Sequence, residues 1–347
     1  MILRLAFIGF GNVGQEFARL LLMKRKWLVS SKGVDIEVRA ISTRSRGTLL
    51  SNRGLDLERV LEELKANGDL RQYGSESVDL TPLEMLDKCG ADIMVELSPL
   101  NVDSGQPAVE HVSFALQSKM HVITANKGPI AFAYDRLEAL AKSRNVKMRF
   151  EGTVMDGTPV FNLVEKTLQG CEILRMEGIL NSTSNFVLTE MFRGRDLTDA
   201  VKEARSKGIA EADASLDLEG WDAAVKITAL ANVLMEAGTT PNKVDRSGIM
   251  GVKPADIDHA KEKGKRLKLV ARADRTDTGV RTSVCVEEVG CESQFWSVEG
   301  TSSALILSTD LMGDITLIES NPAITQTAYA VLSDLLSIVE WMRTDGS

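Results

Sequence analysis

The sequence predicts an α/β protein with two domains, a doubly wound parallel sheet followed by an α+β domain. Its 347 residues exceed the size at which a single hydrophobic core stops growing. The first 150 residues alternate β-rich apolar runs with helical patterns, which is typical of a parallel sheet. Beyond residue 152 several strand patterns follow one another directly, as in an antiparallel sheet.

The first domain begins with the apolar run RLAFIGF (4–10), a glycine-rich turn and a helix that extends to about Lys26. Further strands are expected at 34–43, 91–97, 120–125 and 146–152. Helices are expected between them at 55–67, 106–118 and 134–144. A strand, a glycine turn and a helix in this order, at the start of a βα series, make the domain Rossmann-type.

The second domain has a different order of elements. Helices are expected at 158–169, 185–193, 196–207, 221–237 and 255–264. Strands are expected at 171–180, 266–275, 280–289, 303–310 and 314–319. A last helix at about 323–342 needs a partner for its apolar stripe, and we expect that partner in the first domain. The predicted domains are therefore 1–150 completed by 322–347, and 151–321.

Composition excludes several classes of function. The net charge of −8 and the absence of a basic cluster argue against a nucleic-acid partner. No apolar run approaches the roughly 20 residues that cross a bilayer, and the start of the chain does not resemble a signal peptide. The four cysteines form no C-x-x-C pair, and the three histidines have no metal-ligand spacing with them. We expect a cytoplasmic protein without a structural zinc site.

The turn GFGNVG predicts a dinucleotide site at the first strand. Gly9 permits the tight turn, Gly11 lets a pyrophosphate approach the main chain, and Gly14 lets the helix pack closely on the strand. The helix that starts at Asn12 and Val13 would then present free N–H groups to the phosphates. The alternative is a glycine turn without a ligand, which the position inside a βα series disfavours.

The end of the second strand indicates which cofactor is preferred. An acid at this point binds the ribose of NAD, whereas an arginine accommodates the 2′-phosphate of NADP. Here Thr43, Arg44 and Arg46 follow the strand, and no acid occurs before Asp56. A guanidinium matches a phosphate by bidentate hydrogen bonding, so we favour NADP over NAD. The alternative is that both arginines are solvated loop residues.

The stretch LEGWDAAVKITALANVLMEAG (218–238) predicts an apolar helix that nevertheless carries Asp222 and Lys226 near its start. Four residues apart, the two side chains lie on one face. Such a pair is by itself an ordinary helix stabiliser, and an acid in the first turn also suits the helix dipole. An acidic loop, EADASLD, precedes the helix, and this context favours a catalytic pair.

Four stretches resemble the homoserine dehydrogenases in order and spacing. They are NKGPIA (126–131), EGTVMDGTPV (151–160), GILNSTSNF (178–186) and GIAEADASLDLEGWDAAVK (208–226). The resemblance continues more weakly through TAYAVLSDLL (327–336). It implies an NAD(P)-dependent interconversion of L-homoserine and L-aspartate 4-semialdehyde, which belongs to threonine and methionine biosynthesis, and it points to a homodimer.

The resemblance also implies roles for single residues. Lys226 matches the family's acid/base lysine, Asp222 its acidic partner, and Lys127 a second lysine where nicotinamide and substrate meet. Glu211 and Asp217 match carboxylates that hold the ammonium group of the substrate. The chemistry asks for such groups independently, since an ammonium stabilises a developing alkoxide and can deliver a proton to it.

Two further sets of residues follow from the same comparison. Thr183 lies in the family's substrate-binding loop. Glu151, with the main-chain carbonyls of Val154, Asp156 and Thr158, matches a site for a monovalent cation, Na⁺ or K⁺. The residues that we expect at the cofactor are Gly9, Gly11, Asn12, Val13, Gly14, Thr43, Arg44, Arg46, Ser98, Pro99 and Lys127.

The chain departs from the family pattern in three places. The stretch ESNPAITQTAYA (319–330) has no glycine before the last helix, and Ser182 and Asp156 stand where glycine is usual. Two other functions stay open. One is a dehydrogenase of the same architecture that acts on another amino-acid carbonyl, and the other is a catalytically silent nucleotide-binding paralogue. No cysteine lies in a motif of the kind that an aldehyde dehydrogenase needs.

The predicted homodimer also has a physical reason in the second domain. An antiparallel sheet that is covered by helices on one face can bury its other face only against another layer. The pattern TSVCVEEV (282–289) is typical of a strand in such a sheet. We therefore expect two copies of the chain to meet through this sheet.

Overall fold

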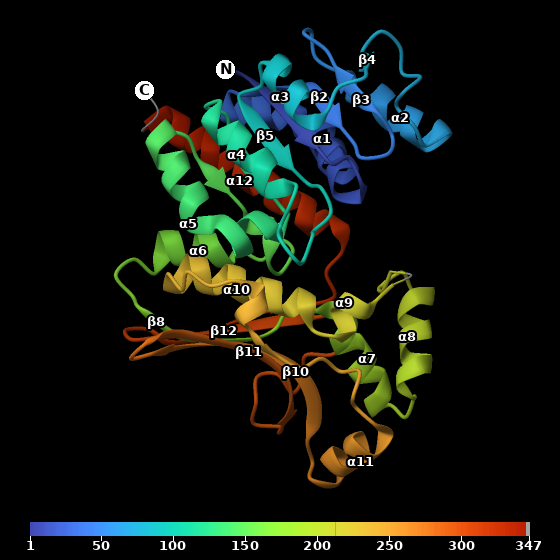
Figure 1. Ribbon diagram of the computed structural model, residues 1–347, viewed down its shortest axis with the longest axis vertical. Coiled ribbons are helices and arrows are strands. Elements are labelled where there is room, and N and C mark those ends of the chain that lie inside the picture. Colours follow the sequence, from blue (N-terminus) through green and yellow to red (C-terminus); the bar gives the residue numbers. More distant parts are fainter. Residues whose placement is uncertain (212, 345–347) are drawn as a thin grey trace. The chain divides into compact units, whose positions relative to one another are not determined.

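The computed structural model describes residues 1–211 and 213–344 (Figure 1). The described chain divides into two compact units. The first unit is Met1–Pro159 together with the segment that begins at Ala323, and the second unit is Val160–Pro322. None of the described helices is both long enough and apolar enough to cross a membrane.

The first unit is built on a seven-stranded sheet in the order β4-β3-β2-β1-β5-β6-β7. Its strands are β1 (Ile2–Ile8), β2 (Asp35–Ser42), β3 (Thr48–Leu50), β4 (Ser77–Val78), β5 (Ile93–Glu96), β6 (His121–Thr124) and β7 (Met148–Arg149). Its main helices are α1 (Asn12–Lys32), α2 (Leu57–Asn67), α3 (Pro82–Cys89), α4 (Ala108–Gln117), α5 (Lys127–Arg144) and α12 (Ile324–Thr344). The α/β class is confirmed, and the central strands pair in parallel.

One edge of this sheet differs from the sequence prediction. Strands β3 and β4 pair antiparallel with their neighbours, and sequence reasoning missed both strands as well as α3. With three and two residues, β3 and β4 are too short to show a period-two pattern. The sheet is therefore parallel at its centre and antiparallel at the β4 edge.

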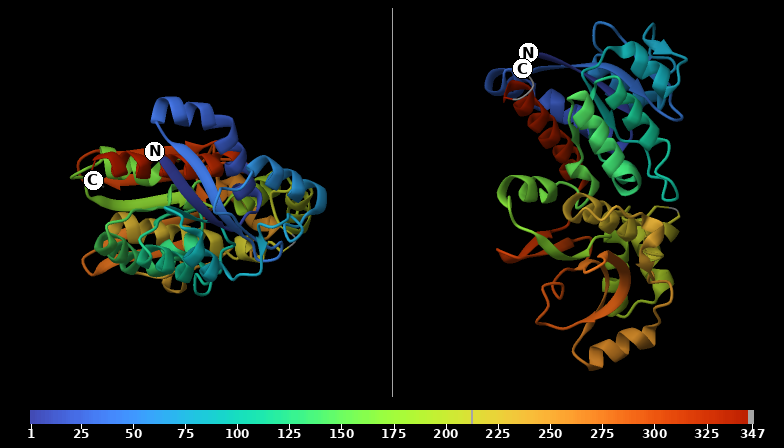
Figure 2. Two further views of the ribbon diagram at one scale, coloured as in Figure 1. Left: turned by 90° about the horizontal axis from the view of Figure 1, so that it is seen from above. Right: turned by 60° about the vertical axis from the view of Figure 1, so that its left-hand side comes forward.

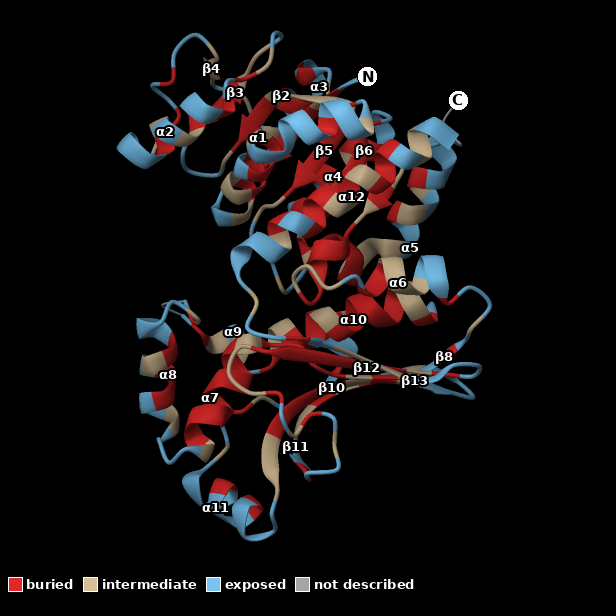
Figure 3. Ribbon diagram, turned by 180° about the vertical axis from the view of Figure 1, so that it is seen from behind, coloured by how far each residue is buried: buried red, intermediate tan, exposed pale blue. Residues whose placement is uncertain are grey.

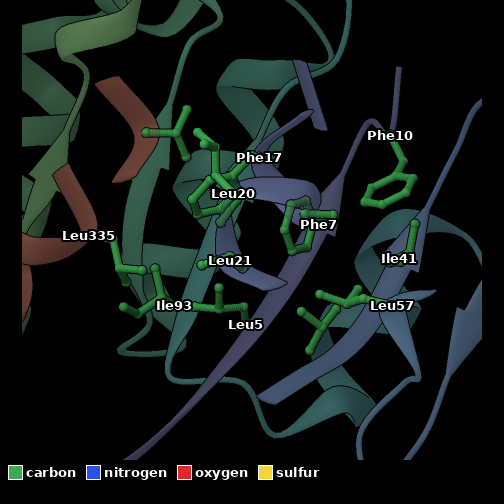
Figure 4. Close-up of a cluster of buried hydrophobic side chains, with 14 of the residues drawn as sticks. Leu5, Phe7, Phe10, Phe17, Leu20, Leu21, Ile41, Leu57, Ile93 and Leu335 are labelled. Atoms are coloured by element: carbon green, nitrogen blue, oxygen red, sulfur yellow. The ribbon is translucent and has the colours of Figure 1, made fainter. Parts of the chain in front are cut away.

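The core of the first unit lies between β1 and the helices that cover it (Figure 4). The ring of Phe7 in β1 packs edge to face on the ring of Phe10, with 5.4 Å between the ring centroids, and it also packs on the ring of Phe17 in α1. Strand β1 is buried on both faces along its second half, so consecutive residues there are apolar and large side chains pack on either side of it. Figure 3 shows β5 and β6 buried, whereas the outer sides of α1 and α2 are exposed.

The last helix, α12, completes this core. Its Leu335 packs into the cluster in Figure 4, and both views of Figure 2 place the red helix beside the blue N-terminal elements. Arg343 donates to the main-chain oxygen of Lys32 at the end of α1. The apolar stripe of TAYAVLSDLL is thus buried against residues more than 280 positions earlier in the chain, as the contact of α1 with α12 shows.

The division between the units lies at 159/160, later than the change of pattern at residue 152. The short turn η1 (Glu151–Thr153) packs on α12, and the main-chain N–H of Glu151 donates to Asp334 Oδ2 at 2.9 Å. Thr327 Oγ1 also donates to Asp156 Oδ1 at 2.8 Å. These contacts with the last helix hold residues 151–159 in the first unit.

The second unit is built on a six-stranded sheet in the order β13-β12-β8-β10-β11-β9. Its strands are β8 (Ile173–Ile179), β9 (Asp245–Arg246), β10 (Arg266–Thr276), β11 (Gly279–Val289), β12 (Ser303–Thr309) and β13 (Gly313–Glu319). Its helices are α6 (Val160–Thr167), α7 (Ser182–Phe192), α8 (Leu197–Ser206), α9 (Ser215–Leu218), α10 (Trp221–Met235) and α11 (Pro254–Glu262), with the short turn η2 (Pro241–Lys243). The expected antiparallel pairing is confirmed for β8 and β10 to β13.

Helix α10 packs on β8, β10 and β11 of this sheet. It begins after Gly220, whose φ of +82° lies in the left-handed region that favours glycine. This glycine separates α10 from the one-turn helix α9 (Ser215–Leu218). The helix expected at 221–237 is therefore present as α10, and Leu218 of the stretch 218–238 belongs to α9. The break lets the residues of α9 turn toward the start of α10, where the charged pair lies.

Candidate functional site

The glycine turn of the first unit leaves its main chain open where a ligand would approach. Gly9 has φ of +87°, and a Cβ there would lie 2.5 Å from the main chain of Leu97. A Cβ on Gly14 would lie 3.1 Å from the oxygen of Gly9, so helix and strand are in close contact. At Gly11 a Cβ would meet none of the described atoms within 4 Å, and no described side chain caps the start of α1. The N–H groups of this helix end are thus accessible to an anion.

A cavity of about 1160 Å³ lies beside this turn. Part of its lining follows the carboxyl ends of β1, β2 and β5, where ligands of open α/β sheets bind. The residues of this part that sequence reasoning expected at the cofactor are Gly9, Thr43, Arg44, Ser98 and Pro99. The cavity is large enough for a dinucleotide, since ligand pockets span about 300–1,000 Å³.

The basic residues around this cavity differ from those that the sequence suggested. Arg44 lines the cavity, whereas Arg46 is exposed and is not part of the lining. Arg71 lines the cavity as well, and it donates to the oxygen of Ser45 at 2.6 Å and pairs with Asp69 at 2.5 Å. Sequence reasoning missed Arg71 because it lies far from the second strand along the chain. A main-chain bond from Leu70 to Arg46 brings its segment against the 43–48 loop.

Asn126 connects two loops at the carboxyl edge of the sheet. Its Nδ2 donates to the oxygen of Ser98 at 2.8 Å and of Pro99 at 3.3 Å, while its Oδ1 caps α5 by accepting from Gly128 at 2.9 Å. Lys127, the expected second lysine, is the first residue of α5. The cap therefore fixes the main chain from which the Lys127 side chain starts.

A buried hydrogen-bonded pair, Glu96 and His111, lies behind the same loops and was not expected from the sequence. Glu96 ends β5 and is fully buried, and its Oε2 lies 2.8 Å from His111 Nδ1. The other oxygen of Glu96 accepts from the main-chain N–H of Ser98 at 2.8 Å. His111 lines the cavity, so the pair supports both the 98–99 loop and the cavity wall. An apolar strand end followed by a single acid is the only signal in the sequence that could have indicated it.

The segment expected to hold a cation lies wholly in the first unit. Glu151 is buried, and Met155 and Asp156 have φ of +51° and +47°. The second value explains why a glycine is usual at Asp156, since the left-handed region favours glycine and tolerates aspartate. Among the described residues no group of three or more histidine, cysteine, aspartate or glutamate side chains is arranged to hold a metal ion.

The second unit brings four of its polar side chains together at the start of α10. Lys226 Nζ lies 3.1 Å from Asp222 Oδ2 and donates to the oxygen of Leu180 at 2.6 Å. Asn181 Nδ2 donates to Asp217 Oδ1 at 2.8 Å and to Asp222 Oδ2 at 3.0 Å. We call Asn181, Asp217, Asp222 and Lys226 the lysine cluster. It explains how α10 carries two charges at low cost, because each has a hydrogen-bonded partner.

The environment of Asp217 disfavours the ionised form of its carboxyl group. Burial and the neighbouring Asp222 raise the pKa of Asp217, while hydrogen bonds from Thr183 and Asn181 and the charge of Lys226 oppose this shift. A carboxylate in this setting is well prepared to bind a cationic group, because each new positive charge favours its ionised form.

The remaining expected substrate residues lie at different distances from the lysine cluster. Thr183 is buried in the first turn of α7, and its single hydroxyl hydrogen is shared between Asp217 and the oxygen of Ile209, which lies 3.4 Å from Oγ1. Glu211 is exposed, and it forms no hydrogen bond with any described residue of the cluster. The structure therefore groups Thr183 with the cluster and leaves Glu211 outside it.

Comparisons with known proteins identify the family of this chain. A family profile described as "Homoserine dehydrogenase, NAD binding domain" matches residues 9–151, and one described as "Homoserine dehydrogenase" matches residues 159–336. An NAD(+)-dependent homoserine dehydrogenase of Pseudomonas canavaninivorans is 35% identical, with 96% of each chain covered. A homoserine dehydrogenase of Methanocaldococcus jannaschii is 34% identical over 95% of this chain and 97% of its own.

Solved structures give the same result. A hyperthermophilic archaeal homoserine dehydrogenase in complex with NADPH superposes with a TM-score of 0.84 at 30% identity, covering 98% of both chains. The homoserine dehydrogenase of Thermoplasma acidophilum also superposes with a TM-score of 0.84, at 25% identity, covering 98% of this chain and 100% of its own. The chain therefore belongs to the homoserine dehydrogenase family of NAD(P)-dependent oxidoreductases that act on a CH–OH group.

Proposed function

We propose that this chain catalyses the reversible oxidation of L-homoserine to L-aspartate 4-semialdehyde, with NADP as its preferred cofactor and as a step of threonine and methionine biosynthesis. The lysine cluster is the observation that carries the proposal. It combines an ammonium group with two carboxylates beside the first turn of α7. The substrate has complementary groups, namely an alcohol that must lose a proton and an ammonium that needs negative charge.

Lys226 is the acid/base group of this mechanism. Its Nζ is held by Asp222 and by the oxygen of Leu180, which fixes the position of the ammonium group. In the reductive direction an alkoxide develops at the substrate oxygen, and the ammonium stabilises this charge and then transfers a proton. Asp222 orients the lysine through the ion pair at 3.1 Å. When it is bound, the nicotinamide supplies or accepts the hydride.

The ammonium group of the substrate is assigned to the acidic side of the cluster. Asp217 is half-buried next to Thr183, and burial together with the neighbouring Asp222 raises its pKa. Glu211, in the same loop, is proposed as a second carboxylate that approaches the substrate on binding. Lys127 is proposed as a second lysine at the reacting end, held by the Asn126 cap.

NADP preference is supported by the two arginines of the cavity. Arg44 and Arg71 both line it, and no acid ends β2, where NAD-specific sites carry one. The known relatives differ in this respect, because the Pseudomonas relative is named as NAD(+)-dependent and the archaeal structure contains NADPH. Direct comparison of the two cofactors is therefore the test of this part.

A monovalent cation is proposed at Glu151 and the carbonyls of Val154, Asp156 and Thr158. Carboxylate and carbonyl oxygens are the donors that hard cations prefer, and contacts with α12 pin both ends of this segment. Turnover in KCl or NaCl should exceed turnover in choline chloride at equal ionic strength. Equal rates in all three salts would contradict the cation proposal.

A homodimer is proposed to form through the face of the six-stranded sheet that α10 does not cover. An ion network of Arg272 with Glu177 and Glu287 lies on β8, β10 and β11, and its side chains are only about one-fifth to one-quarter exposed. A second layer can cover such a half-buried face. Sedimentation equilibrium at micromolar concentration tests this, and a monomer would contradict it.

A cytoplasmic location is also proposed, because all four cysteines are free thiols.

The test of the central proposal is spectrophotometry of the purified chain. L-Homoserine with NADP should give reduced cofactor at a steady rate, and NAD should give a lower kcat/KM. Reduction with another amino alcohol but not with homoserine would favour the alternative dehydrogenase. Cofactor binding without any turnover would favour the catalytically silent paralogue.

A further inference from the structure

Asn181 lies at the centre of the lysine cluster, although no charge drew attention to it in the sequence. It follows the end of β8 and precedes α7, and it is 5% exposed. It is the N-cap of α7, because its Oδ1 accepts from the main-chain N–H of Ser184 at 2.8 Å. A capping role alone would account for an asparagine here.

The cap also fixes which way the amide faces. A main-chain N–H can only donate, so the Asn181 oxygen must face Ser184 and its nitrogen must face the other side. Both hydrogens of Nδ2 are then directed at carboxylates, one at Asp217 Oδ1 and one at Asp222 Oδ2. All three strong hydrogen-bonding positions of the amide are therefore used, and none can change without breaking another.

The charges around Asp217 show why this amide matters. The charged groups that face Asp217 within the second unit are Asp222 and Lys226, both on α10. Lys226 lies against Asp222 at 3.1 Å, so its charge is shared and Asp217 keeps a like-charged neighbour. The N–H groups of Asn181 donate to both carboxylates at once and so place positive hydrogen atoms between two like charges.

We propose that Asn181 is a positioning residue that holds Asp217 and Asp222 together as two ionised carboxylates, one for the substrate ammonium and one for Lys226. This inference rests on the proposed function. Asn181 touches neither cofactor nor reacting atoms, and acts only through the two acids. Loss of its amide should let Asp217 take up a proton at a higher pH, because the hydrogen bond from Asn181 is one of the interactions that lower the pKa of this buried carboxyl.

Two variants separate this role from helix capping. Serine caps a helix about as well as asparagine but offers no amide donors, so Asn181→Ser removes only the contacts to the acids. Asn181→Asp keeps both the shape and the capping oxygen, and places a third carboxylate oxygen against the other two. For comparison, Asp196→Ser exchanges the exposed N-cap of α8 in the same unit, where the side chain accepts from Asp199 at 2.8 Å.

The measurements are kcat and KM for homoserine across pH, together with the melting temperature. Asn181→Ser should raise KM for homoserine roughly 10- to 100-fold, the value of one or two hydrogen bonds to a charged group. The acidic limb of kcat/KM should move to higher pH in Asn181→Ser and further in Asn181→Asp. KM for the cofactor and the melting temperature should stay near the wild-type values, as should every value for Asp196→Ser.

The two hypotheses fail in different ways. If the wild-type chain oxidises homoserine and both Asn181 variants keep its KM and its pH profile, Asn181 is only a cap and the inference is wrong. If the wild-type chain does not use homoserine, the proposed function fails instead. In that case the titration of the Asp217 carboxyl, followed by NMR of its carboxyl carbon, still tests whether Asn181 stabilises the ionised form of Asp217. An equal titration midpoint in wild type and Asn181→Ser would overturn it.

Discussion

Lys268 is a buried ammonium group whose effect on stability can be calculated. It lies on β10 and is 2% exposed. Its Nζ donates to Asn185 Oδ1 at 3.0 Å and to the oxygen of Val298, both neutral acceptors. Burial, together with the nearby Arg266, lowers the pKa of Lys268 from 10.5 to about 8, and Glu299 offsets this only in part. The folded chain therefore holds this proton less tightly than the unfolded chain does.

The sign and size of the effect follow from proton linkage. Between pH 8 and pH 10.5 the unfolded chain binds more protons at this lysine, so stability should rise with pH across that window. Above pH 10.5 the amine is neutral in both states, and below pH 8 the folded chain bears the full cost of the buried charge. Each pKa unit corresponds to about 1.4 kcal/mol, so the whole shift from 10.5 to about 8 corresponds to about 3.5 kcal/mol. About 2–3 kcal/mol of this falls between pH 8 and pH 10.5, because the lysine is half-titrated in the folded chain at one end of the window and in the unfolded chain at the other.

The assay is urea unfolding of wild type and Lys268→Met at several pH values in this window. Methionine has a similar length but does not titrate, so the stability of wild type relative to Lys268→Met should increase by about 2–3 kcal/mol from pH 8 to pH 10.5. Lys265→Met is the matched control, because Lys265 lies at the surface and pairs with Glu288 at 3.1 Å. A pH-independent difference between wild type and Lys268→Met would refute the reasoning, whatever the size of that difference.

Three further predictions concern the candidate site and the first unit. Lys226→Ala should lower turnover by roughly two to four orders of magnitude while cofactor binding and melting temperature change little; Lys226→Arg should restore little, because a guanidinium does not release its proton near neutral pH. A melting temperature that falls sharply with near-normal turnover in the folded fraction would show that the lysine is structural. Arg44→Ala and Arg71→Ala should each raise KM for NADP more than KM for NAD, because both arginines line the cavity. Arg46→Ala should change either KM little, because Arg46 is not part of the lining. Equal changes in KM for the two cofactors would show that Arg44 and Arg71 do not contact the 2′-phosphate. Burial lowers the pKa of His121 from 6.5 to about 4, so the unfolded chain binds more protons between these pH values and stability should fall as the pH falls from 6.5 toward 4. In His121→Asn the melting temperature should decrease less over this pH range. An unchanged decrease would show that His121 does not cause it.

The sequence by itself determined the local features of this protein. Alternating apolar runs and helical patterns identified the parallel centre of the first sheet and the antiparallel strands of the second, because each pattern reflects which faces of one element are buried. The glycine turn was also legible, since the requirement for glycine at Gly9 comes from its own φ and from the adjoining strand. The pair Asp222–Lys226 was visible because four residues is one helical turn.

Only the tertiary structure decided which distant residues meet. Arg71 reaches the cavity through main-chain contacts of its loop, and no periodic pattern records such a contact. Asn181 meets Asp217 and Asp222 across 36 and 41 residues of chain, after β8, α7, α9 and α10 have packed around one point. A hydrogen bond of this kind depends on the positions of several elements at once, whereas sequence patterns report the burial of one element at a time. The charged residues of the candidate site could therefore be predicted from the sequence, whereas the contacts of the neutral Asn181 amide with two of them could not.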